Sequence, residues 1–227
     1  MRNKMLFYDE FASEFEAKMN KYEMRKRLDL IYDEMLKPSE IANKYLLDAG
    51  SGTGWFSQRA TERGASVVSL DVGENILAQV AMKCETKRVV GSVLEIPFPD
   101  NTFDVVVCTE VIEHTPNPRQ AVTELCRVLK PGGILILTVP NQFWKWACVL
   151  ANVLKLRPYE GYENWVGYNQ LKRWVQTEPR MQVKQHFGFN IIPCFVSFTY
   201  PLIDFFDRFG HSLGWAMVNI AIRAEKQ

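Results

Sequence analysis

The sequence predicts an α/β fold, built on a doubly wound, seven-stranded and mostly parallel sheet. Short apolar runs, such as residues 45–50 and 103–109, alternate along the chain with segments of helical period. The early runs are nearly continuous in apolar residues, which is typical of parallel strands covered on both faces. Strands that alternate with helices in this way indicate a doubly wound sheet.

The hydrophobic periodicity and the turn-forming glycines and prolines indicate where each element begins and ends. A glycine turn after the first run opens a helix, and Asp71 ends the second run before another helix. The segment Leu129-Lys130-Pro131-Gly132-Gly133 ends a helix and reopens into an apolar strand. Strands are expected near residues 45–50, 66–71, 87–91, 103–109, 133–139, 188–197 and 215–224. Helices are expected near residues 17–36, 54–63, 74–84, 117–129, 143–155, 168–176 and 200–209.

Length and composition predict one ordinary globular domain. The chain has 227 residues, of which 47% are hydrophobic and 23% are charged, enough to bury a sizeable core without splitting. The net charge is +1 and the two signs are interspersed, so no nucleic-acid partner is expected. Five cysteines, none in a C-x-x-C pair, predict buried reduced thiols in a cytoplasmic protein.

Neither a signal peptide nor a transmembrane span is expected. The N-terminus is too acidic and lacks a long apolar core. The longest apolar stretch, residues 143–156, is interrupted by Lys145, Trp146 and Lys155 and falls short of the roughly 20 residues that a span needs. Peripheral contact with a membrane and the oligomeric state are left open by the sequence.

The segment from Leu46 to Gly54 carries the clearest sign of a ligand site. An apolar strand breaks there into a turn with glycines at Gly50, Gly52 and Gly54. Glycine accepts positive φ and lets a ligand approach the backbone closely, and the following helix presents unpaired N–H groups. A strand, a glycine turn and a helix N-terminus together indicate a nucleotide-type cofactor. The alternative is a tight turn without a ligand.

Trp55 helps to decide which cofactor the turn would hold. It stands where the dinucleotide fingerprint G-x-G-x-x-G has its third glycine, which argues against an NAD-dependent oxidoreductase. The pattern from Asp48 to Gly54 instead resembles motif I of the class I S-adenosylmethionine-dependent methyltransferases, which have a Rossmann-like fold. The resemblance covers residues 5–145 well and includes the turn Leu129-Lys130-Pro131-Gly132-Gly133.

Asp71 supports the same interpretation. It ends the second strand and lies 23 residues after Asp48, where an acid can accept hydrogen bonds from ribose hydroxyls. In the family this position binds both hydroxyls of the adenosine ribose. The alternative role is a cap for the helix that starts near Glu74.

The resemblance implies a set of cofactor contacts at the carboxyl ends of the strands. Ser92 stands where the family often has an acid for the adenine amino group, so the backbone N–H of Val93 is the safer contact. Tyr8, with Phe15, matches an aromatic opening that closes over the cofactor, although both could simply pack on the sheet. The residues predicted to bind S-adenosylmethionine are Tyr8, Asp48, Gly50, Ser51, Gly52, Asp71, Val72, Ser92, Val93 and Thr109.

The polar cluster after the fourth strand is the candidate for catalysis. Glu110, Glu113 and His114 would share a face if a helical turn began there. His114 is predicted to act as a general base. The runner-up is a Mg²⁺ site formed by all three residues, since the same E-x-x-E-H string occurs in ubiquinone-biosynthesis O-methyltransferases. The third alternative is a merely structural His114.

The region after the fifth strand is rich in aromatic residues. In this fold such an insertion forms much of the acceptor pocket, so we expect a small aromatic or lipidic acceptor, methylated at a phenolic or hydroxyl oxygen. N- or C-methylation and non-catalytic cofactor binding are the alternatives. Within one domain, 1–227, we expect an N-terminal helical lid at 1–40, a cofactor-binding core at 41–140, an acceptor or lid insertion at 141–187, and C-terminal strands and a helix at 188–227.

Overall fold

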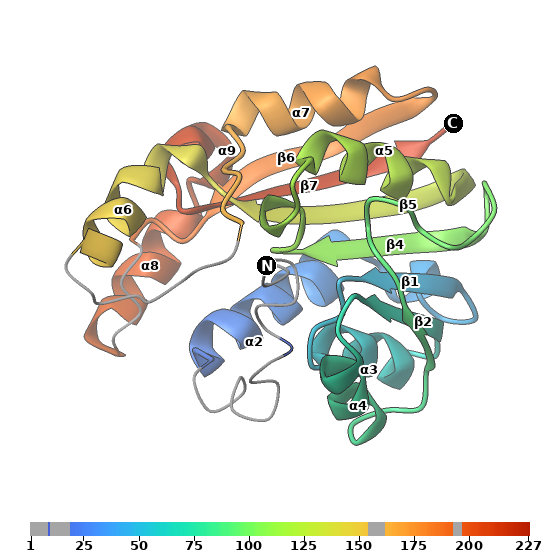
Figure 1. Ribbon diagram of the computed structural model, residues 1–227. Helices are drawn as coiled ribbons and strands as arrows, with labels where there is room; N and C mark the ends of the chain where they lie inside the picture. The colour runs from blue at the N-terminus through green and yellow to red at the C-terminus, as the bar shows by residue number, and fades with distance from the viewer. Residues whose placement is uncertain (1–8, 10–18, 154–161, 193–196) are drawn as a thin grey trace.

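Seven strands form one mixed sheet in the order β3-β2-β1-β4-β5-β7-β6 (Figure 1). The computed structural model describes residues 9, 19–153, 162–192 and 197–227. β1 to β5 pair in parallel, and β7 runs antiparallel to both β5 and β6. The predicted seven-stranded, mostly parallel sheet is therefore confirmed. The strands are β1 Tyr45–Ala49, β2 Ser66–Asp71, β3 Lys87–Val90, β4 Phe103–Thr109, β5 Leu129–Pro140, β6 Met181–Phe189 and β7 Asn219–Lys226.

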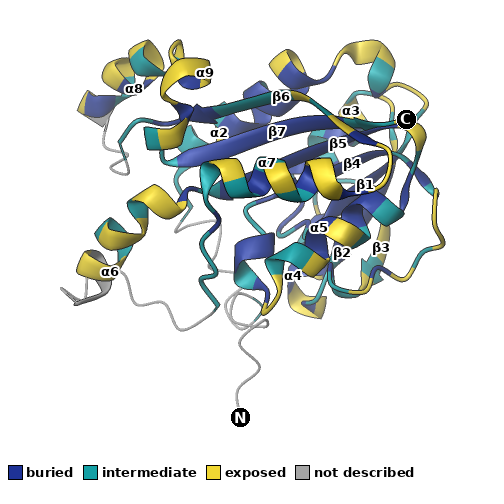
Figure 2. Ribbon diagram, turned by 90° about the horizontal axis from the view of Figure 1, so that it is seen from above, coloured by how far each residue is buried: buried dark blue, intermediate teal, exposed yellow. Residues whose placement is uncertain are grey.

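Helices cover both faces of the sheet (Figure 2). The main helices are α2 Lys21–Asp29, α3 Trp55–Glu62, α4 Glu74–Ala81, α5 Pro118–Arg127, α6 Lys145–Val153, α7 Tyr168–Thr177, α8 Tyr200–Asp207 and α9 Gly210–Leu213. Short turns of π-helix or 3₁₀-helix lie at η3 Leu30–Met35, η4 Pro38–Glu40, η5 Ile112–His114, η6 Gln142–Trp144, η7 Ser197–Thr199 and η8 Gly214–Ala216.

The apolar core has two layers, one on each face of the sheet. Successive side chains of a strand point to opposite faces, and β4 shows this directly. Val106 packs with residues of α5 and α7, whereas Val105 and Val107 pack with residues of η3 and α3. Because both faces are buried, the strand reads as a continuous apolar run, and this is why its position could be predicted.

The prediction for the sixth strand was wrong. The sequence favoured residues 188–197, but β6 is Met181–Phe189 and ends where Asn190 adopts a left-handed φ of 60°. β6 lies at the edge of the sheet and pairs only with β7. Its exposed positions are therefore polar. The run that follows β6 is more apolar, and for that reason the strand was predicted there. β6 begins inside the range 141–187 that was assigned to the insertion.

Smaller differences occur at other element ends. The helix expected from residue 17 begins at Lys21, because the Asn20 side chain accepts the N–H groups of Tyr22 and Glu23 and caps it. β7 begins at Asn219 rather than near 215, because residues 214–216 form a 3₁₀ turn. No helix within the described ranges is long and apolar enough to cross a membrane.

Two of the four described cysteines fit the prediction of buried thiols. Cys108 and Cys126 are buried, Cys84 and Cys148 are partly buried, and all four are free thiols. Cys194 lies outside the described residues, as do Tyr8 and Phe15.

Candidate functional site

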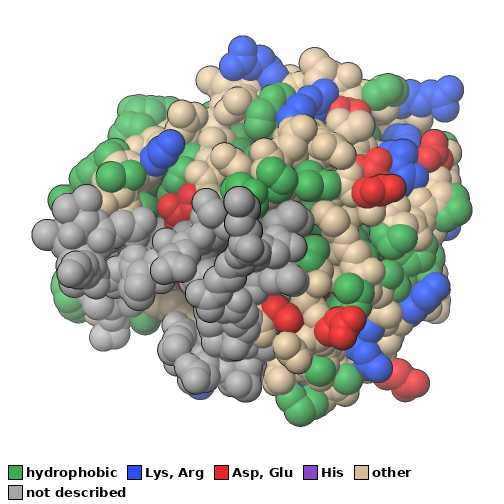
Figure 3. All heavy atoms as spheres, in the orientation of Figure 1, with side chains coloured by type: hydrophobic (Ala, Val, Ile, Leu, Met, Phe, Trp, Pro, Cys, Tyr) green, Lys and Arg blue, Asp and Glu red, His purple; other side chains and the backbone are tan. Residues whose placement is uncertain are grey.

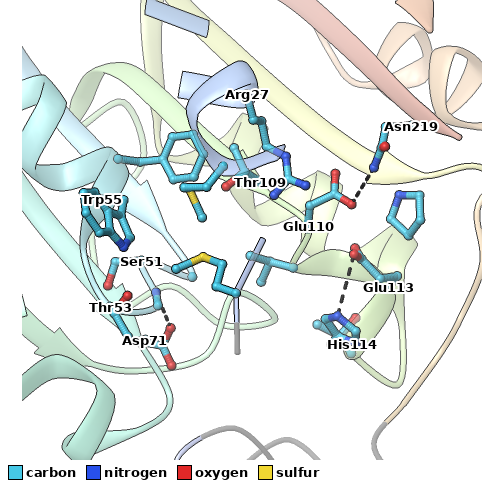
Figure 4. Close-up of a pocket in the computed structure, with 18 of the residues that line it drawn as sticks. Arg27, Ser51, Thr53, Trp55, Asp71, Thr109, Glu110, Glu113, His114 and Asn219 are labelled. Atoms are coloured by element: carbon cyan, nitrogen blue, oxygen red, sulfur yellow. Dashed lines mark hydrogen bonds and ion pairs between the residues drawn. The ribbon is translucent and has the colours of Figure 1, made fainter. Parts of the chain in front are cut away.

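A cavity of about 630 Å³ opens at the carboxyl ends of β1, β2 and β4 (Figure 4). Its floor is formed by Gly50 and Gly52 after β1 and by Asp71 at the end of β2. Thr109 ends β4 and lines the far side. Ligands bind at this position in doubly wound sheets, outside the carboxyl ends of the strands.

The glycine turn needs its glycines for steric reasons. Gly50, Gly52 and Gly54 have φ values of 78°, 51° and 89°, a region that residues with a Cβ atom rarely adopt. A Cβ on Gly50 would also lie 2.3 Å from Cγ2 of Val111. The N–H groups of Gly50 and Ser51 donate to the carbonyl of Leu70 at 2.7 and 2.9 Å, so the turn is anchored on β2.

Asp71 connects the glycine turn to the start of α4. One carboxylate oxygen accepts the N–H of Gly52 at 3.0 Å, and the other accepts the N–H of Gly73 at 3.1 Å. Burial raises the pKa of Asp71, against these backbone donors, which favour the charged form. The two expected roles are thus compatible, since Asp71 holds the first backbone groups before α4 and still lines the cavity.

Not every predicted contact lines the cavity. Val72 and Val93 do, but Asp48 lies beneath the glycine turn, where its carboxylate accepts the hydroxyl of Ser57 at 2.6 Å. Asp48 is 1% exposed, and burial raises its pKa to about 7. The hydroxyl of Ser92 accepts the N–H of Leu94 at 3.1 Å. Ser92 is not among the lining residues.

Helix α2 contributes a wall that the sequence did not predict. Asn20, Glu23, Met24 and Arg27 follow the helical spacing i, i+3, i+4 and i+7, and all four line the cavity. Arg27 is 8% exposed and pairs with Glu23 at 2.5 Å, while its Nε atom has no hydrogen-bond partner. A buried guanidinium with a spare donor at the edge of a cavity is suited to an anionic ligand group.

The polar cluster after β4 does not form one helical face. Glu110 has a left-handed φ of 54°, and its carboxylate accepts the side-chain amide of Asn219 on β7 at 2.9 Å. Figure 4 shows Arg27 and Glu110 turned toward one another. Glu113 and His114 sit in the next turn, η5, with Glu113 Oε1 at 3.8 Å from His114 Nε2.

Burial and neighbouring charges shift the pKa values of the two carboxyl groups in this cluster. Burial raises the pKa of Glu113 well above its usual range, and the nearby charge of Glu110 adds to this effect. Burial also raises the pKa of Glu110, while the Arg27 guanidinium opposes the rise. Three carboxyl groups, those of Glu23, Glu110 and Glu113, therefore share one buried cation, and their repulsion favours the neutral form of Glu113.

The residues of the expected magnesium site do not fit a metal ion. Among the described residues, no three His, Cys, Asp or Glu side chains are arranged to hold one. Glu110 faces a donor amide and a guanidinium, which take the place that a cation would need. His114 binds the carbonyl of Tyr162 through Nδ1 at 2.9 Å. Glu110 and His114 thus have other partners, and no metal-dependent step follows from this arrangement.

Comparison with known proteins decides the family. A family profile described as a methyltransferase domain matches residues 47–137. A ubiquinone biosynthesis O-methyltransferase from Pseudomonas putida is 30% identical over 68% of this chain and 72% of the relative. The chain belongs to the class I S-adenosylmethionine-dependent methyltransferases. It is an enzyme of this family, and S-adenosylmethionine is the cofactor that the family implies.

Solved structures of other methyltransferases have the same fold as this chain. An S-adenosylmethionine-dependent methyltransferase from Thermotoga maritima superposes with a TM-score of 0.70 at 14% identity, covering 99% of this chain and 100% of that one. Another from Mesorhizobium loti gives a TM-score of 0.63 at 14% identity and covers 96% and 100%.

The outer end of the methyltransferase cavity is built by segments far apart in sequence. Trp144 and Cys148 come from η6 and α6, and Trp165 comes from the loop before α7. This loop is tied to η5, because the N–H of Asn164 donates to the carbonyl of Glu113 at 2.8 Å. The Nδ2 atom of Asn164 donates to the carbonyl of Thr115 at 2.6 Å. Long-range hydrogen bonds thus fix the wall that faces His114.

The cavity carries an excess of acidic side chains. Asp9, Glu23, Asp71, Glu110, Glu113 and Glu163 line it, against Arg27 as the lining guanidinium. S-adenosylmethionine bears a positive sulfonium, which such a surface favours over a neutral thioether. The acidic lining therefore fits the cofactor that the family implies.

Proposed function

We propose that this methyltransferase transfers a methyl group from S-adenosylmethionine to a hydroxyl oxygen, most simply a phenol, of a small or lipidic acceptor. The observation that carries the proposed base chemistry is the orientation of His114. Its Nδ1 lies 2.9 Å from the carbonyl oxygen of Tyr162. Since a carbonyl only accepts hydrogen bonds, Nδ1 carries a proton, and in the neutral imidazole Nε2 then has the lone pair that a base needs.

The reaction follows from this tautomer. Nε2 of His114 accepts the proton of the acceptor hydroxyl as the oxygen attacks the methyl carbon. The bond between carbon and sulfur breaks, its electron pair stays on sulfur, and the positive sulfonium becomes the neutral thioether of S-adenosylhomocysteine. Glu113 Oε1 lies 3.8 Å from Nε2, and it would stabilise the imidazolium only in its ionised form, which burial disfavours. Alignment of the two reactants and exclusion of water supply the remaining rate enhancement.

We infer one orientation of the cofactor from the described residues. Asp71 would accept hydrogen bonds from the ribose hydroxyls, with Val72 and Val93 beside the adenine. Arg27 would pair with the carboxylate of the methionine part, because its buried guanidinium has a donor to spare. This arrangement directs the sulfonium toward Glu110 and the acceptor end.

Two features support an oxygen acceptor. The relatives at about 30% identity are named O-methyltransferases of ubiquinone biosynthesis, and the outer end of the cavity presents the indole rings of Trp144 and Trp165. Aromatic walls with few polar anchors suit a flat or greasy acceptor. A weakly acidic phenol also gains most from a neighbouring base, since deprotonation makes its oxygen a much stronger nucleophile.

An amine acceptor is the second candidate, favoured by Glu163, which lines the cavity together with the two indoles. Carboxylates and aromatic faces attract ammonium groups. An amine that arrives protonated would also give its proton to His114, so the base alone does not separate the two acceptors. The choice has to be made with substrates.

The test measures release of S-adenosylhomocysteine with panels of catechols and alkylphenols, and of matched aryl amines. We expect turnover with phenols to fall about 100-fold in His114→Ala, while calorimetry shows the same affinity for S-adenosylhomocysteine. His211→Ala is the matched control, because His211 is exposed on α9 and is not among the lining residues. Equal turnover in wild type and His114→Ala would show that His114 is not the base. Turnover of amines but not of phenols would show that the acceptor atom is nitrogen rather than oxygen.

A further inference from the structure

Helix α2 presents two faces to two different parts of the molecule. One face carries Glu23 and Arg27 into the wall of the cofactor cavity. Tyr22 and Lys26, four residues apart, share another face, and both contact Asp204 on α8. Figure 1 shows α2 and α8, which come from opposite ends of the chain, on the same side of the molecule. The placement of α2 on α8 therefore bears on the position of the cavity wall.

The contact between α2 and α8 is made by aromatic rings and charges. The ring of Tyr22 stacks on that of Tyr200, with centroids 3.7 Å apart and planes 1° from parallel. The hydroxyl of Tyr22 donates to Asp204 at 2.6 Å. Nζ of Lys26 lies 2.8 Å from Asp204 and 2.6 Å from Asp207. The side chains of Lys26 and Asp207 are 18% and 17% exposed, so this ion pair is screened less than a surface pair.

Apolar packing contributes little to the attachment of either helix. The buried residues of α2 are Arg27 and Leu28, and the buried residue of α8 is Ile203. Leu202 and Phe205 of α8 are 46% and 52% exposed, and Figure 3 shows apolar side chains on the surface at the edge where Figure 1 places α8. Helices are usually held in place by an apolar face. The polar contacts between α2 and α8 therefore have a larger share in placing these two helices.

Asp207 connects this contact to the sheet and to the cavity. Its other carboxylate oxygen accepts the backbone N–H of Asn190, just after β6, at 2.8 Å. The side-chain amide of Asn190 donates to Asn219 at 3.2 Å, and the amide of Asn219 donates to Glu110 at 2.9 Å. Glu110 in turn faces Arg27 (Figure 4). A series of polar contacts thus leads from α8, through β6 and β7, back to the cavity wall on α2.

The charges between the two helices make Lys26 hard to replace. A smaller cavity of about 290 Å³ between α2, β6 and α8 is lined by the acids Glu34, Asp204 and Asp207 and by the cations Lys26 and Arg208. Without the Lys26 ammonium, three acids would share the one remaining cation of this lining, and their repulsion would favour separation of the helices. Lys26 is therefore the side chain whose loss should loosen α2 most.

We propose that Lys26 and Tyr22 are positioning residues for the methyl donor, which hold α2 on α8 so that Arg27 meets the carboxylate of the methionine part. Neither is among the described residues that line the cofactor cavity, so each would act through α2. Lys26 directly precedes Arg27 in the helix, and a rotation of α2 that releases the ammonium also turns the guanidinium. The inference rests on the proposed contact between Arg27 and the cofactor carboxylate, and it adds the residues that set this contact.

The experiment compares two ligands by calorimetry with the full chain. S-adenosylhomocysteine has the carboxylate, and methylthioadenosine lacks it. We expect Lys26→Met to bind S-adenosylhomocysteine about tenfold more weakly, because the charge-assisted hydrogen bond from Arg27 is misplaced, and to bind methylthioadenosine like the wild type. Lys26→Arg keeps a cation between the two acids and should recover most of the affinity. Tyr22→Phe keeps the ring stack but loses the hydrogen bond to Asp204, and should weaken S-adenosylhomocysteine alone by about threefold.

A double variant tests whether Lys26 acts through Arg27. Lys26→Met combined with Arg27→Met should bind S-adenosylhomocysteine as Arg27→Met does, because a positioning residue has no further effect once the positioned group is gone. Lys130→Met is the matched control. It removes an ion pair with Asp104 at 2.9 Å, at the start of β5 and thus at the end of the sheet opposite the cavity. This control should bind both ligands like the wild type. Thermal unfolding of every variant identifies a protein that has not folded.

Three results would overturn the positioning role: a folded Lys26→Met that binds S-adenosylhomocysteine like the wild type, one that loses both ligands equally, or an effect that adds fully to that of Arg27→Met. If Lys26→Met does not fold, Tyr22→Phe decides by the same comparison. An Arg27→Met variant that binds both ligands like the wild type would refute the cofactor orientation, and the positioning role with it. A wild type that binds S-adenosylhomocysteine but methylates neither phenols nor amines would overturn the proposed methyl transfer alone.

Discussion

Asp71 accepts the backbone N–H of Gly52 at 3.0 Å, which joins the end of one strand to the glycine turn that follows its neighbour. The same carboxylate holds the N–H of Gly73 at 3.1 Å. A single side chain therefore sets the spacing between the turn and the start of α4, and it does so at the floor of the cavity. This arrangement makes Asp71 the most informative position for cofactor binding.

Asp71→Ala is expected to weaken S-adenosylmethionine binding by about 1–3 kcal/mol, because charged hydrogen bonds to the ribose are lost. Calorimetric titration measures the change. Asp71→Asn should recover part of it, since the amide oxygen can still accept one backbone N–H. Asp100→Ala is the control, because that carboxylate is 68% exposed and pairs with Arg127, an interaction of small worth. Unchanged affinity in Asp71→Ala would remove Asp71 from the cofactor site.

Arg27 allows a test with two ligands. In Arg27→Met we expect S-adenosylhomocysteine to bind about 10–100-fold more weakly, because a charge-assisted hydrogen bond to its carboxylate is lost. Methylthioadenosine lacks this carboxylate and should bind wild type and variant equally. An equal loss for both ligands would mean that Arg27 shapes the cavity rather than binding the carboxylate. Arg27→Lys, which keeps the charge near Glu110 and Glu113, separates these effects from a loss of folding.

The cofactor half of the site could be predicted because it is local in sequence. Gly50, Gly52 and Asp71 lie within 22 residues of each other. A strand that runs into a glycine-rich turn is compatible with few local structures other than a ligand-binding turn. Arg27 was missed, although its helical spacing with Asn20, Glu23 and Met24 was visible. Nothing in a single amphipathic helix says which element its polar residues will face.

The acceptor half could be predicted less well, because tertiary contacts build it. Glu110 was expected to start a helical turn, but its left-handed φ of 54° turns the carboxylate toward Asn219 on β7. These two residues are 109 positions apart, so no local pattern links them. The same holds for the contact between His114 and Tyr162, which fixes the tautomer on which the proposed chemistry depends.

Gly50→Ala should destabilise the fold by roughly 2–4 kcal/mol, from positive φ and from the clash of the new Cβ with Val111. Adding Val111→Ala removes the clash but not the backbone strain, so the double variant should recover part of the loss in thermal unfolding. Gly132→Ala is the control: Gly132 has a φ of 79° with no atom within 4 Å of the added Cβ, so it measures strain alone. Equal destabilisation in Gly50→Ala and Gly132→Ala would show that the Val111 side chain moves away from the new Cβ without a measurable cost in stability.

We expect the buried carboxyl group of Asp48 to make the protein less stable as pH rises. Burial raises its pKa to about 7 in the folded protein, against about 3.9 in an unfolded chain. Between these values the folded state holds a proton that the unfolded state has released, so Asp48 makes the free energy of unfolding fall as pH rises from about 4 to about 7. The full change is on the order of 4 kcal/mol, at 1.36 kcal/mol for each pKa unit.

Asp48→Asn should remove that slope. The amide stays neutral and its oxygen can still accept the hydroxyl of Ser57, which lies 2.6 Å from the carboxylate. The variant should therefore match the wild type near pH 4 and unfold at a higher denaturant concentration at pH 8. Asp104→Asn should change stability in the opposite direction. Burial alone would raise the pKa of Asp104, but the Tyr45 N–H and the Lys130 ammonium outweigh burial and hold that pKa below its usual value. Its loss should destabilise the protein at pH 8. Parallel curves for wild type and Asp48→Asn between pH 4 and 8 would show that Asp48 is ionised throughout.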